Sequence, residues 1–570
     1  MTDYADTLAA DSKALCIVWD FPDLQTRFVT RNHAGLTLPQ GWTLFEGAEP
    51  LRDEGSSIDP VEAKLTSGAA SFRIADENQA VTAWLAQNDG ALYLTQVTRK
   101  QGFLDGVEAN YQVSRWLFAD YRGAEPAGGA YELQLTNVLR ALENSLYEDF
   151  DGESYRLGAD LGDAATTITL ENSPKGKWRE PGYCVLHNRD EQLYELVGYQ
   201  TIGGTGNKDL QTCTRRVYGV GRSGYTWPQD DSQAIQVWIK RGNPLSIMLE
   251  WMLSTDTPGA NGPYDTGADG LGAKVDQSYV DVAGIESLRD DYWPVPVFSG
   301  NALQSGTAVL FVEKDPIEDL GEWISKHILQ PLGLFPIVKA DERFSVETRF
   351  RVPPNTAQVG DEWMKEELKA TEWSRGLDGS RINNLLLKTD FDLEDDDYAL
   401  TSKKEDTLSS GSYGKAKAQE VEGRGQRTGR LGFPDYNGAA NISVGASRII
   451  LDCGNPWSEI KAALFYKHKD LDLAQNIALN VPTTPNLATG SRGGDDRLYN
   501  LDRRRVDDSS GRIEVELRER RTLYRAAFIA PDDVADDYDS ASQADKQYCY
   551  CTPNDDDVFP NGDPSYKVVD

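Results

Sequence analysis

Four histidines are the residues of this chain best suited to acid–base chemistry, and they are scattered as His33, His187, His327 and His468. Imidazole titrates near neutral pH, so histidine is the usual general acid or base. His187 has Asp190 and Glu191 close behind it, a combination found in lysozyme and amidase sites. With 91 acidic residues in the chain, that spacing carries almost no information, and neither GxSxG nor HExxH occurs. We therefore predict no catalytic residues and no enzymatic activity.

An acid-rich segment is the best candidate for a metal site. The sequence FDLEDDDY brings six carboxylates together within eight residues, namely Asp390, Asp392, Glu394, Asp395, Asp396 and Asp397. Oxygen ligands suit calcium, but an EF-hand loop needs glycine at its sixth position, where Asp395 stands, and no distal glutamate is in register. Because runs of charge mostly lie on surfaces, we predict a solvated acidic loop and no metal site. Weak calcium binding is the alternative.

Two motifs have the letters of a binding site without its context. GVGRSG, residues 219–224, matches GxGxxG, which needs a strand before the glycines and a helix after them to bind a dinucleotide. A strand is expected before it, but YTWPQDDS follows, so we predict a hairpin turn and no cofactor. Cys549 and Cys551 are too few and too close for a zinc or iron–sulfur site, which needs about four ligands. Free or buried thiols are predicted there.

The composition describes a large acidic protein of several domains. The chain has 570 residues, 39% of them hydrophobic, and no apolar run of 18 or more, so no transmembrane helix is expected. The first residues lack the features of a secretory signal. Six cysteines fit synthesis in a reducing cytosol. With 91 acidic and 58 basic residues the net charge is −33, which disfavours non-specific binding to nucleic acid.

Basic residues gather in two segments. The first holds Lys415, Lys417, Arg424, Arg427 and Arg430, and the second holds Arg503, Arg504, Arg505, Arg518, Arg520, Arg521 and Arg525. One interpretation is a solvated surface balanced by the acidic remainder. The other is pairing with acidic faces of neighbouring subunits in a ring.

Alternating apolar residues predict a β-rich chain with flanking helices. Strands are expected at Leu15–Trp19, Phe72–Ile74, Leu92–Val97, Tyr111–Phe118 and Tyr131–Leu135, and a helix at Asn137–Leu146. Residues 160–240 then give several short strands on polar turns, among them TTITL, YELVGY and AIQVWIK, which predict a small barrel or sandwich. Three further helices are predicted where a capping residue precedes proline: Asn243-Pro244, Asp315-Pro316 and Asn455-Pro456.

The last 40 residues change character. Residues 531–570 hold eleven acidic residues against Lys546 and Lys567. Such a composition predicts a loosely ordered tail, whereas the interleaved tyrosines suggest a segment that docks on a partner. Both interpretations stay open at this stage.

Several segments, taken in order, resemble baseplate hub proteins of tailed phages. The element TTITL … ELVGY … TRRVYGVG resembles their inserted β-domain. LYLTQVTRKQGF … YQVSRWLFADYRG … YELQLTNVLRALENSL looks like the N-terminal domain of siphophage and gene-transfer-agent hubs. NPLSIMLEWMLS, VDVAGIESLRD and DPIEDLGEWISKHILQPLGLFPIVKADERFSVE resemble the central region, and RINNLLLKTDFD with GRIEVELRER the region after it. The resemblance covers about 500 residues as a succession of loose motifs.

The resemblance implies a mainly β, multidomain fold with two tube-like antiparallel β-barrels and a small inserted β-barrel. The expected division is 1–154 (first tube-like barrel with a helix), 155–242 (inserted barrel), 243–340 (α/β linking domain), 341–530 (second tube-like barrel) and 531–570 (acidic tail). It also implies a homotrimer at the tail tip of a virion, made in the host cytoplasm.

Such a ring would adapt the sixfold tail tube to a threefold tip. Its implied partners are the distal tail protein, the tape-measure protein and a tail fibre or central tip protein. DNA would pass through an acidic channel without specific binding during ejection. No cofactor and no membrane insertion are implied. The alternatives are a receptor- or carbohydrate-binding or degrading tail protein, favoured by 13 tryptophans and 25 tyrosines, and a cellular secretion-system spike.

Overall fold

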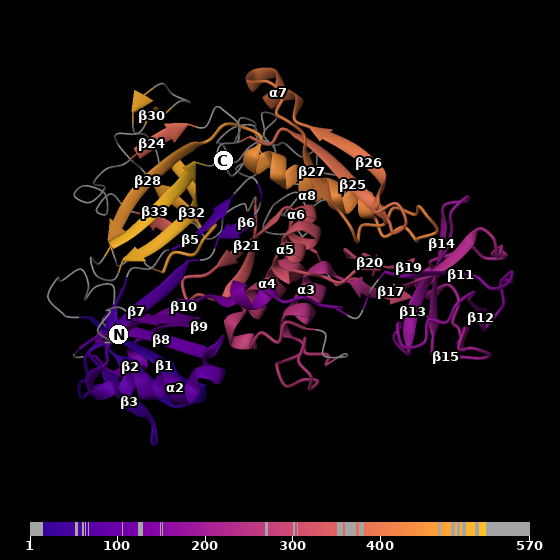
Figure 1. Ribbon diagram of the computed structural model, residues 1–570. Coiled ribbons are helices and arrows are strands. Elements are labelled where there is room, and N and C mark those ends of the chain that lie inside the picture. Colours follow the sequence, from indigo (N-terminus) through magenta and orange to yellow (C-terminus); the bar gives the residue numbers. More distant parts are fainter. Residues whose placement is uncertain are drawn as a thin grey trace.

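The computed structural model is a mainly β protein in which several sheets surround a helical centre (Figure 1). The predicted fold class, mainly β with flanking helices and several domains, is confirmed; closure of the sheets into barrels stays a prediction. The structure describes residues 15–51, 55–59, 62, 64–66, 68–104, 106–123, 129–148, 150, 152–267, 272–293, 295–299, 302–304, 306–349, 357–359, 372–375, 381–465, 468, 470–479, 485–486, 491–492, 497–507 and 512–519.

An eight-stranded sheet forms the N-terminal part of the molecule, drawn in indigo and purple in Figure 1. Its strands, in spatial order, are β3 (Thr43–Glu46), β2 (Thr26–Val29), β1 (Leu15–Phe21), β8 (Gln96–Phe103), β9 (Gln112–Gly123), β10 (Ala130–Thr136), β7 (Ala69–Ala75) and β4 (Glu49–Pro50). Helix α2 (Ala80–Leu92) packs on this sheet through Trp84, whose ring meets those of Phe21 and Phe28 edge-on. Buried aromatic rings therefore hold the helix to the sheet.

A smaller β-domain projects from the opposite side of the molecule, in magenta in Figure 1. Its main sheet contains β11 (Ser154–Arg156), β17 (Ser232–Gly242), β13 (Gly182–Asn188) and β14 (Leu193–Tyr199), and a second sheet contains β12 (Ile168–Thr169), β16 (Asp209–Gln211) and β15 (Thr201–Gly203). Strand β17 also pairs with β20 (Val309–Glu313), which connects this domain to the centre. The predicted strands YELVGY and AIQVWIK are confirmed as β14 and β17.

The helical centre contains the largest buried apolar cluster. Its elements are α3 (Pro244–Leu253), α4 (Val282–Tyr292), α5 (Leu320–Ile324), a π-helical turn (Ser325–Leu329), α6 (Gln330–Leu332) and the hairpin β21 (Leu334–Val338) and β22 (Phe344–Thr348). Helix α3 is capped by Asn243, whose Oδ1 accepts from the N–H groups of Leu245 and Ser246. Met248 and Met252 are fully buried in this cluster.

A second eight-stranded sheet, yellow and orange in Figure 1, lies above the N-terminal sheet in that view. It contains β23 (Ala357–Val359), β29 (Asn476–Leu479), β32 (Arg497–Asp507), β33 (Arg512–Glu519), β28 (Ser458–Phe465) and β24 (Glu372–Arg375), together with β5 (Ser56–Asp59) and β6 (Lys64–Thr66). The last two come from the N-terminal part of the chain: β5 pairs with β32, and Ile58 enters the C-terminal core.

The remaining elements complete the molecule around the centre. They are the sheet β26 (Asp397–Glu405), β25 (Asn384–Asp392) and β27 (Gln419–Glu422), helices α7 (Thr407–Tyr413) and α8 (Gly438–Cys453), and the short pairs β18 (Phe298–Ser299) with β19 (Ala302–Leu303) and β30 (Pro485–Asn486) with β31 (Ser491–Arg492). Among the described residues, no helix has the length and apolar character needed to cross a membrane.

Two predicted helix starts and one predicted helix are wrong. Asp315-Pro316 is followed by a bridge between Ile317 and Leu146, and α5 begins only at Leu320, capped by Asp319. That bridge also ends the predicted helix at Asn137–Leu146, where only a 3₁₀ turn, Val138–Glu143, forms. After Asn455-Pro456 the chain enters β28. A cap and a proline fix a local turn, and the partners of the following residues decide what comes next.

Two further local predictions are corrected. The predicted strand Leu92–Val97 is divided: Leu92 ends α2, Leu94 takes a positive φ of 59° in a turn, and β8 begins at Gln96. The strand expected before GVGRSG is a 3₁₀ turn, Val217–Gly219, in which Tyr218 has a φ of 53°. The motif lies in a loop with no helix after it, whereas a dinucleotide site needs a helix N-terminus at that place.

Candidate functional site

The tip of the β21–β22 hairpin lies where the two large sheets approach each other. Strand β21 has two buried faces: Leu334 enters the central core, and Phe335 and Ile337 enter the core of the C-terminal sheet. Successive side chains of a strand point to opposite faces, so one strand is shared by two cores. Residues 339–343, called here the 339–343 turn, close the hairpin, and Glu342 takes a positive φ of 63° in it.

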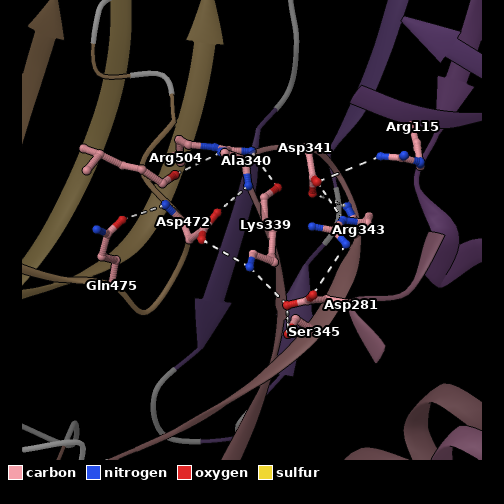
Figure 2. A network of polar contacts seen from close by, with 11 residues as sticks. Arg115, Asp281, Lys339, Ala340, Asp341, Arg343, Ser345, Asp472, Gln475 and Arg504 are labelled. Atoms are coloured by element: carbon pink, nitrogen blue, oxygen red, sulfur yellow. Dashed lines mark hydrogen bonds and ion pairs between the residues drawn. The ribbon is translucent and has the colours of Figure 1, made fainter. Parts of the chain in front are cut away.

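Charged side chains of the 339–343 turn form a network around Asp281 (Figure 2). Lys339 Nζ lies 3.0 Å from Asp281 Oδ2, and Arg343 Nη1 lies 3.4 Å from Asp281 Oδ1. Arg343 Nε is also 2.6 Å from Asp341 Oδ2. Ser345 Oγ donates to Asp281 Oδ2 at 3.2 Å. The cations of the turn therefore stay paired within the centre of the molecule.

The same turn contacts both large sheets. On the N-terminal side, the N–H of Arg115 in β9 donates to the Asp341 carbonyl at 3.1 Å. On the C-terminal side, the N–H of Ala340 donates to Asp472 Oδ1 at 2.7 Å. Arg504 Nη2 of β32 donates to Glu342 Oε1 at 2.9 Å, and both side chains are buried. Three segments remote in sequence thus meet at one turn.

This junction differs from the other attachments of the N-terminal sheet. Leu117 of β9 belongs to the apolar central core, and Tyr279 donates to the Trp116 carbonyl at 2.9 Å in a buried contact. At the junction, by contrast, the Lys339 and Asp472 side chains are 29% and 33% exposed and their charged atoms lie 3.9 Å apart. Partly exposed ion pairs are weak and screened by salt. The Lys339–Asp472 pair can therefore break at a lower cost in free energy than the apolar attachment, whereas the Arg504–Glu342 pair of the same turn is buried.

The structure places the four histidines in unrelated surroundings. His33 hydrogen-bonds the Tyr111 hydroxyl at 2.7 Å. His187 stacks on Tyr194 and lies 3.5 Å from Glu394, not beside Asp190 and Glu191. Burial lowers the pKa of His327 to about 3, so it is neutral at physiological pH. His468 is buried as well.

The acid-rich segment is divided between the core and the surface, which corrects the prediction of one solvated loop. Asp390 is fully buried and accepts from the N–H of Thr428 at 2.9 Å. Asp392, 5% exposed, accepts from the Tyr194 hydroxyl. Glu394 receives Arg189 Nη2 at 2.8 Å. In the described part of the chain, no group of three or more candidate metal ligands is found.

Three arginines of the basic segments, Arg427, Arg504 and Arg518, are buried, and Arg424 is 20% exposed, so the surface interpretation is wrong for these residues. Lys415 and Arg503 are 47% and 42% exposed, as that interpretation expects, and pairing between subunits stays a prediction. Arg424 pairs with Glu313 at 2.8 Å, and burial raises the pKa of Glu313 to about 6. Arg427, fully buried, donates to the carbonyls of Leu310 and Phe391. Arg504 pairs with Glu342, and Arg518 pairs with Asp452 at 2.8 Å. Because the carboxylates that pair with these arginines are remote in sequence, no local sequence pattern predicts that the arginines are paired.

A buried ionic cluster in the N-terminal sheet is not predicted from the sequence. Arg27, 2% exposed, donates Nε to Asp20 at 2.6 Å and Nη2 to Glu108 at 2.8 Å. Lys100 lies 2.7 Å from Glu108. Burial alone would raise the pKa of Glu108, but hydrogen bonds from Arg27 and Lys100 lower it to about 2. The sequence signals this cluster only by placing two charged residues, Asp20 and Arg27, among the apolar residues of strands β1 and β2.

The cysteines of the described residues are buried thiols: Cys16, Cys184, Cys213 and Cys453. Burial raises the pKa of the Cys213 thiol to about 11, so the thiol is protonated at neutral pH. Cys549 and Cys551, like the acidic tail 531–570, lie outside the described residues.

Comparison with known proteins gives structural similarities only. No protein-family model and no curated protein sequence matches the chain. The tail protein from Neisseria meningitidis MC58 is 10% identical, with a TM-score of 0.33, covering 83% of this chain and 92% of that one. A prophage tail protein from Listeria monocytogenes EGD-e is 8% identical, with a TM-score of 0.30, and the match covers 90% of this chain and 96% of that protein. The 43 kDa tail protein of prophage MuSo2 from Shewanella oneidensis is 8% identical, with a TM-score of 0.34, and the match covers 88% of this chain and 98% of that protein. Similarities at this level do not by themselves establish a function.

Proposed function

We propose that this chain is a structural component of a phage tail, and that it forms the baseplate hub at the tail tip. The observation that carries the proposal is where the hub-like segments fall. YQVSRWLFADYRG contains β9 of the first large sheet, NPLSIMLEWMLS contains α3, and GRIEVELRER contains β33 of the second large sheet. Each of these three resembling segments therefore supplies an element of the core or of a large sheet.

The architecture supports a role in assembly. Two eight-stranded sheets in one chain, repeated in a trimer, would place six similar units around an axis. Such a ring would adapt a sixfold tail tube to a threefold tip, with the distal tail protein on one side and a fibre or central tip protein on the other. The tape-measure protein and then DNA would occupy its channel. The net charge of −33 would disfavour binding of the passing DNA.

The first experiment is to measure the native mass of the purified chain by light scattering after gel filtration, with negative-stain electron microscopy of the same peak. A mass of about three times 63.1 kDa together with ring-shaped particles supports the hub. A monomer that also stays monomeric, and shows no binding, when mixed with the distal tail protein of the same particle contradicts it.

The sequence favoured a carbohydrate-binding alternative through its tryptophans. In the structure, nine tryptophans are buried in cores: Trp19, Trp84, Trp116, Trp178, Trp227, Trp238, Trp251, Trp293 and Trp457. A buried ring cannot stack on a sugar, so these residues do not favour this alternative. A glycan-binding array and a reducing-end release assay would separate the two functions, because the hub is expected to give no signal in either.

A further inference from the structure

A polar cavity of about 250 Å³ lies beside the 339–343 turn, between helix α4, the β21–β22 hairpin and strands β29 and β32. Its polar lining includes Asp281, Lys339, Ser345, Asp472, Gln475 and Asn500. Figure 2 shows Lys339 between Asp281 and Asp472, at the place where the central hairpin meets the C-terminal sheet. Side chains from three parts of the chain therefore share one cavity.

The charges in the lining are unbalanced. The lining holds three carboxylates, those of Asp281, Glu347 and Asp472, and one cation, Lys339. Arg343, which is outside the lining, also pairs with Asp281 at 3.4 Å. Lys339 Nζ is close to Asp281, at 3.0 Å, but 3.9 Å from Asp472 Oδ2, beyond hydrogen-bonding distance. Asp472 Oδ1 accepts from the N–H of Ala340. The other oxygen of Asp472, whose side chain is 33% exposed, can therefore accept a donor that arrives from solvent.

A buried amide provides an independent observation. Asn500 lines the cavity and is 2% exposed, and within the described structure its Oδ1 has no hydrogen-bond partner. Buried polar atoms are nearly always paired in folded proteins, and an exception calls for a donor. The carboxylate of Asp472 and this amide oxygen thus both call for a ligand that donates hydrogen bonds.

We propose that this cavity binds a cationic group, a guanidinium or an alkylammonium, supplied by another molecule. Both groups carry positive charge and only hydrogen-bond donors, which matches an acceptor-rich, negatively charged lining. The group can come from an arginine or lysine side chain of a partner protein or from a free polyamine. Binding depends only on the cavity and not on the proposed tail function.

Isothermal titration calorimetry on the full chain at low salt tests the site. The probes are spermidine and the peptide acetyl-Gly-Arg-Gly-amide, with acetyl-Gly-Gln-Gly-amide as the neutral comparison. At least one cationic probe is expected to bind with one-to-one stoichiometry, and Asp472→Asn is expected to weaken it about tenfold. The asparagine oxygen can still accept from the N–H of Ala340, so the turn is retained.

Two further variants complete the design. Asp470→Asn removes the same charge two residues away, from an exposed side chain that accepts from Gln112, and should leave the affinity unchanged. Asn500→Leu removes the unpaired oxygen at similar volume and should weaken binding as Asp472→Asn does. Circular dichroism spectra that match those of the unmodified chain ensure that lost affinity is not lost fold.

The outcomes distinguish the source of the group. Binding of the arginine peptide without spermidine assigns the cavity to a partner's side chain, and the reverse assigns it to a polyamine. Equal affinity for the unmodified chain and Asp472→Asn would overturn the proposal, because it would indicate general attraction of cations to an acidic protein. Equal binding of the glutamine peptide, or no one-to-one binding, would overturn it as well.

Discussion

Buried and partly buried arginines join strands and loops that are remote in the sequence. Arg27 joins β2 to Asp20 of β1 and to Glu108, 81 positions away. Arg424 joins the loop after β27 to Glu313 of β20, 111 positions away. Removing one partner of a buried ion pair leaves the other charge without compensation in a low-dielectric environment. The stability of these regions therefore depends on single side chains.

The Arg27 cluster gives the first prediction at this scale. Arg27→Met is expected to lower the free energy of unfolding of the N-terminal sheet by about 2–4 kcal/mol, since the buried Asp20 would keep only the partly exposed Lys100, at 2.8 Å, as its partner. The matched control is Arg122→Met in the same sheet. Arg122 pairs with Glu132 but is 65% exposed, so its loss should cost under about 1 kcal/mol. Denaturant titration measures both, and equal losses would contradict the prediction.

Glu313 gives a prediction on pH. Burial raises its pKa from 4.5 to about 6 in the folded state. The folded protein therefore holds this proton more tightly than the unfolded chain does, and the stability from this group, complete below pH 4.5, is lost as the pH rises through 6. Relative to the unmodified chain, Glu313→Gln should gain about 2 kcal/mol in free energy of unfolding between pH 4.5 and 7. Unfolding curves at the two pH values test this. A difference between the two proteins that does not change with pH would contradict it.

At the scale of elements, shared strands and caps attach the units to one another. Strand β21 contributes to two cores, and strand β5 leaves the N-terminal part of the chain to pair with β32. Helix α3 is fixed at its start by Asn243, which caps the helix and also donates Nδ2 to the Trp293 carbonyl at 2.5 Å. One residue thus fixes both the helix start and the end of α4.

Asn243 allows those two roles to be separated. Asn243→Ala should lower the free energy of unfolding by about 2 kcal/mol, because it removes both the cap and the contact with Trp293. Asn243→Ser keeps an acceptor for the cap and should recover about half of that loss. Chemical denaturation followed by tryptophan fluorescence measures both variants. The prediction is wrong if serine is no better than alanine.

At the scale of the whole molecule, the two large sheets are held differently to the centre and to each other. Apolar cores attach each sheet to the centre, whereas the contacts between the sheets at the 339–343 turn, and between Gln112 and Asp470, are polar. Apolar attraction changes little when ionic strength rises, while partly exposed charges are screened within a few ångströms. The partly exposed charge pairs of this turn should therefore weaken as the ionic strength rises, while the apolar attachments should not.

Hydrogen exchange followed by mass spectrometry tests this weakness. Between about 0.05 and 1 M salt, where the screening length falls from over 10 Å to about 3 Å, peptides containing the amides of Ala340 and Arg115 should exchange several-fold faster. Strand β13, hydrogen-bonded on both sides to β14 and β17, should not change. Unaltered exchange at the turn would mean that the junction is not held by charge.

The sequence by itself determined the mainly β class, the principal strands and the apolar stripes. Strands β1, β7, β9, β10, β14 and β17 follow from runs of strand-forming residues, either continuously apolar as in β1 or alternating as in β17, and α3 follows from its cap and its apolar stripe. These features depend on neighbours within a few positions, which a linear pattern records. The rule that a capping residue before proline starts a helix gave wrong predictions at Asp315-Pro316 and Asn455-Pro456. There the following residues pair with strands or bridges that are remote in sequence.

Only the tertiary structure decided which charges are buried and what they face. Arg424, Arg504 and Arg518 look like surface charge in the sequence, yet each pairs with a carboxylate that is 66 or more positions away. The cavity beside the 339–343 turn likewise combines residues from α4, the central hairpin and the C-terminal sheet. Whether a charge is buried depends on partners that folding brings within a few ångströms, and composition and spacing carry no record of those distances.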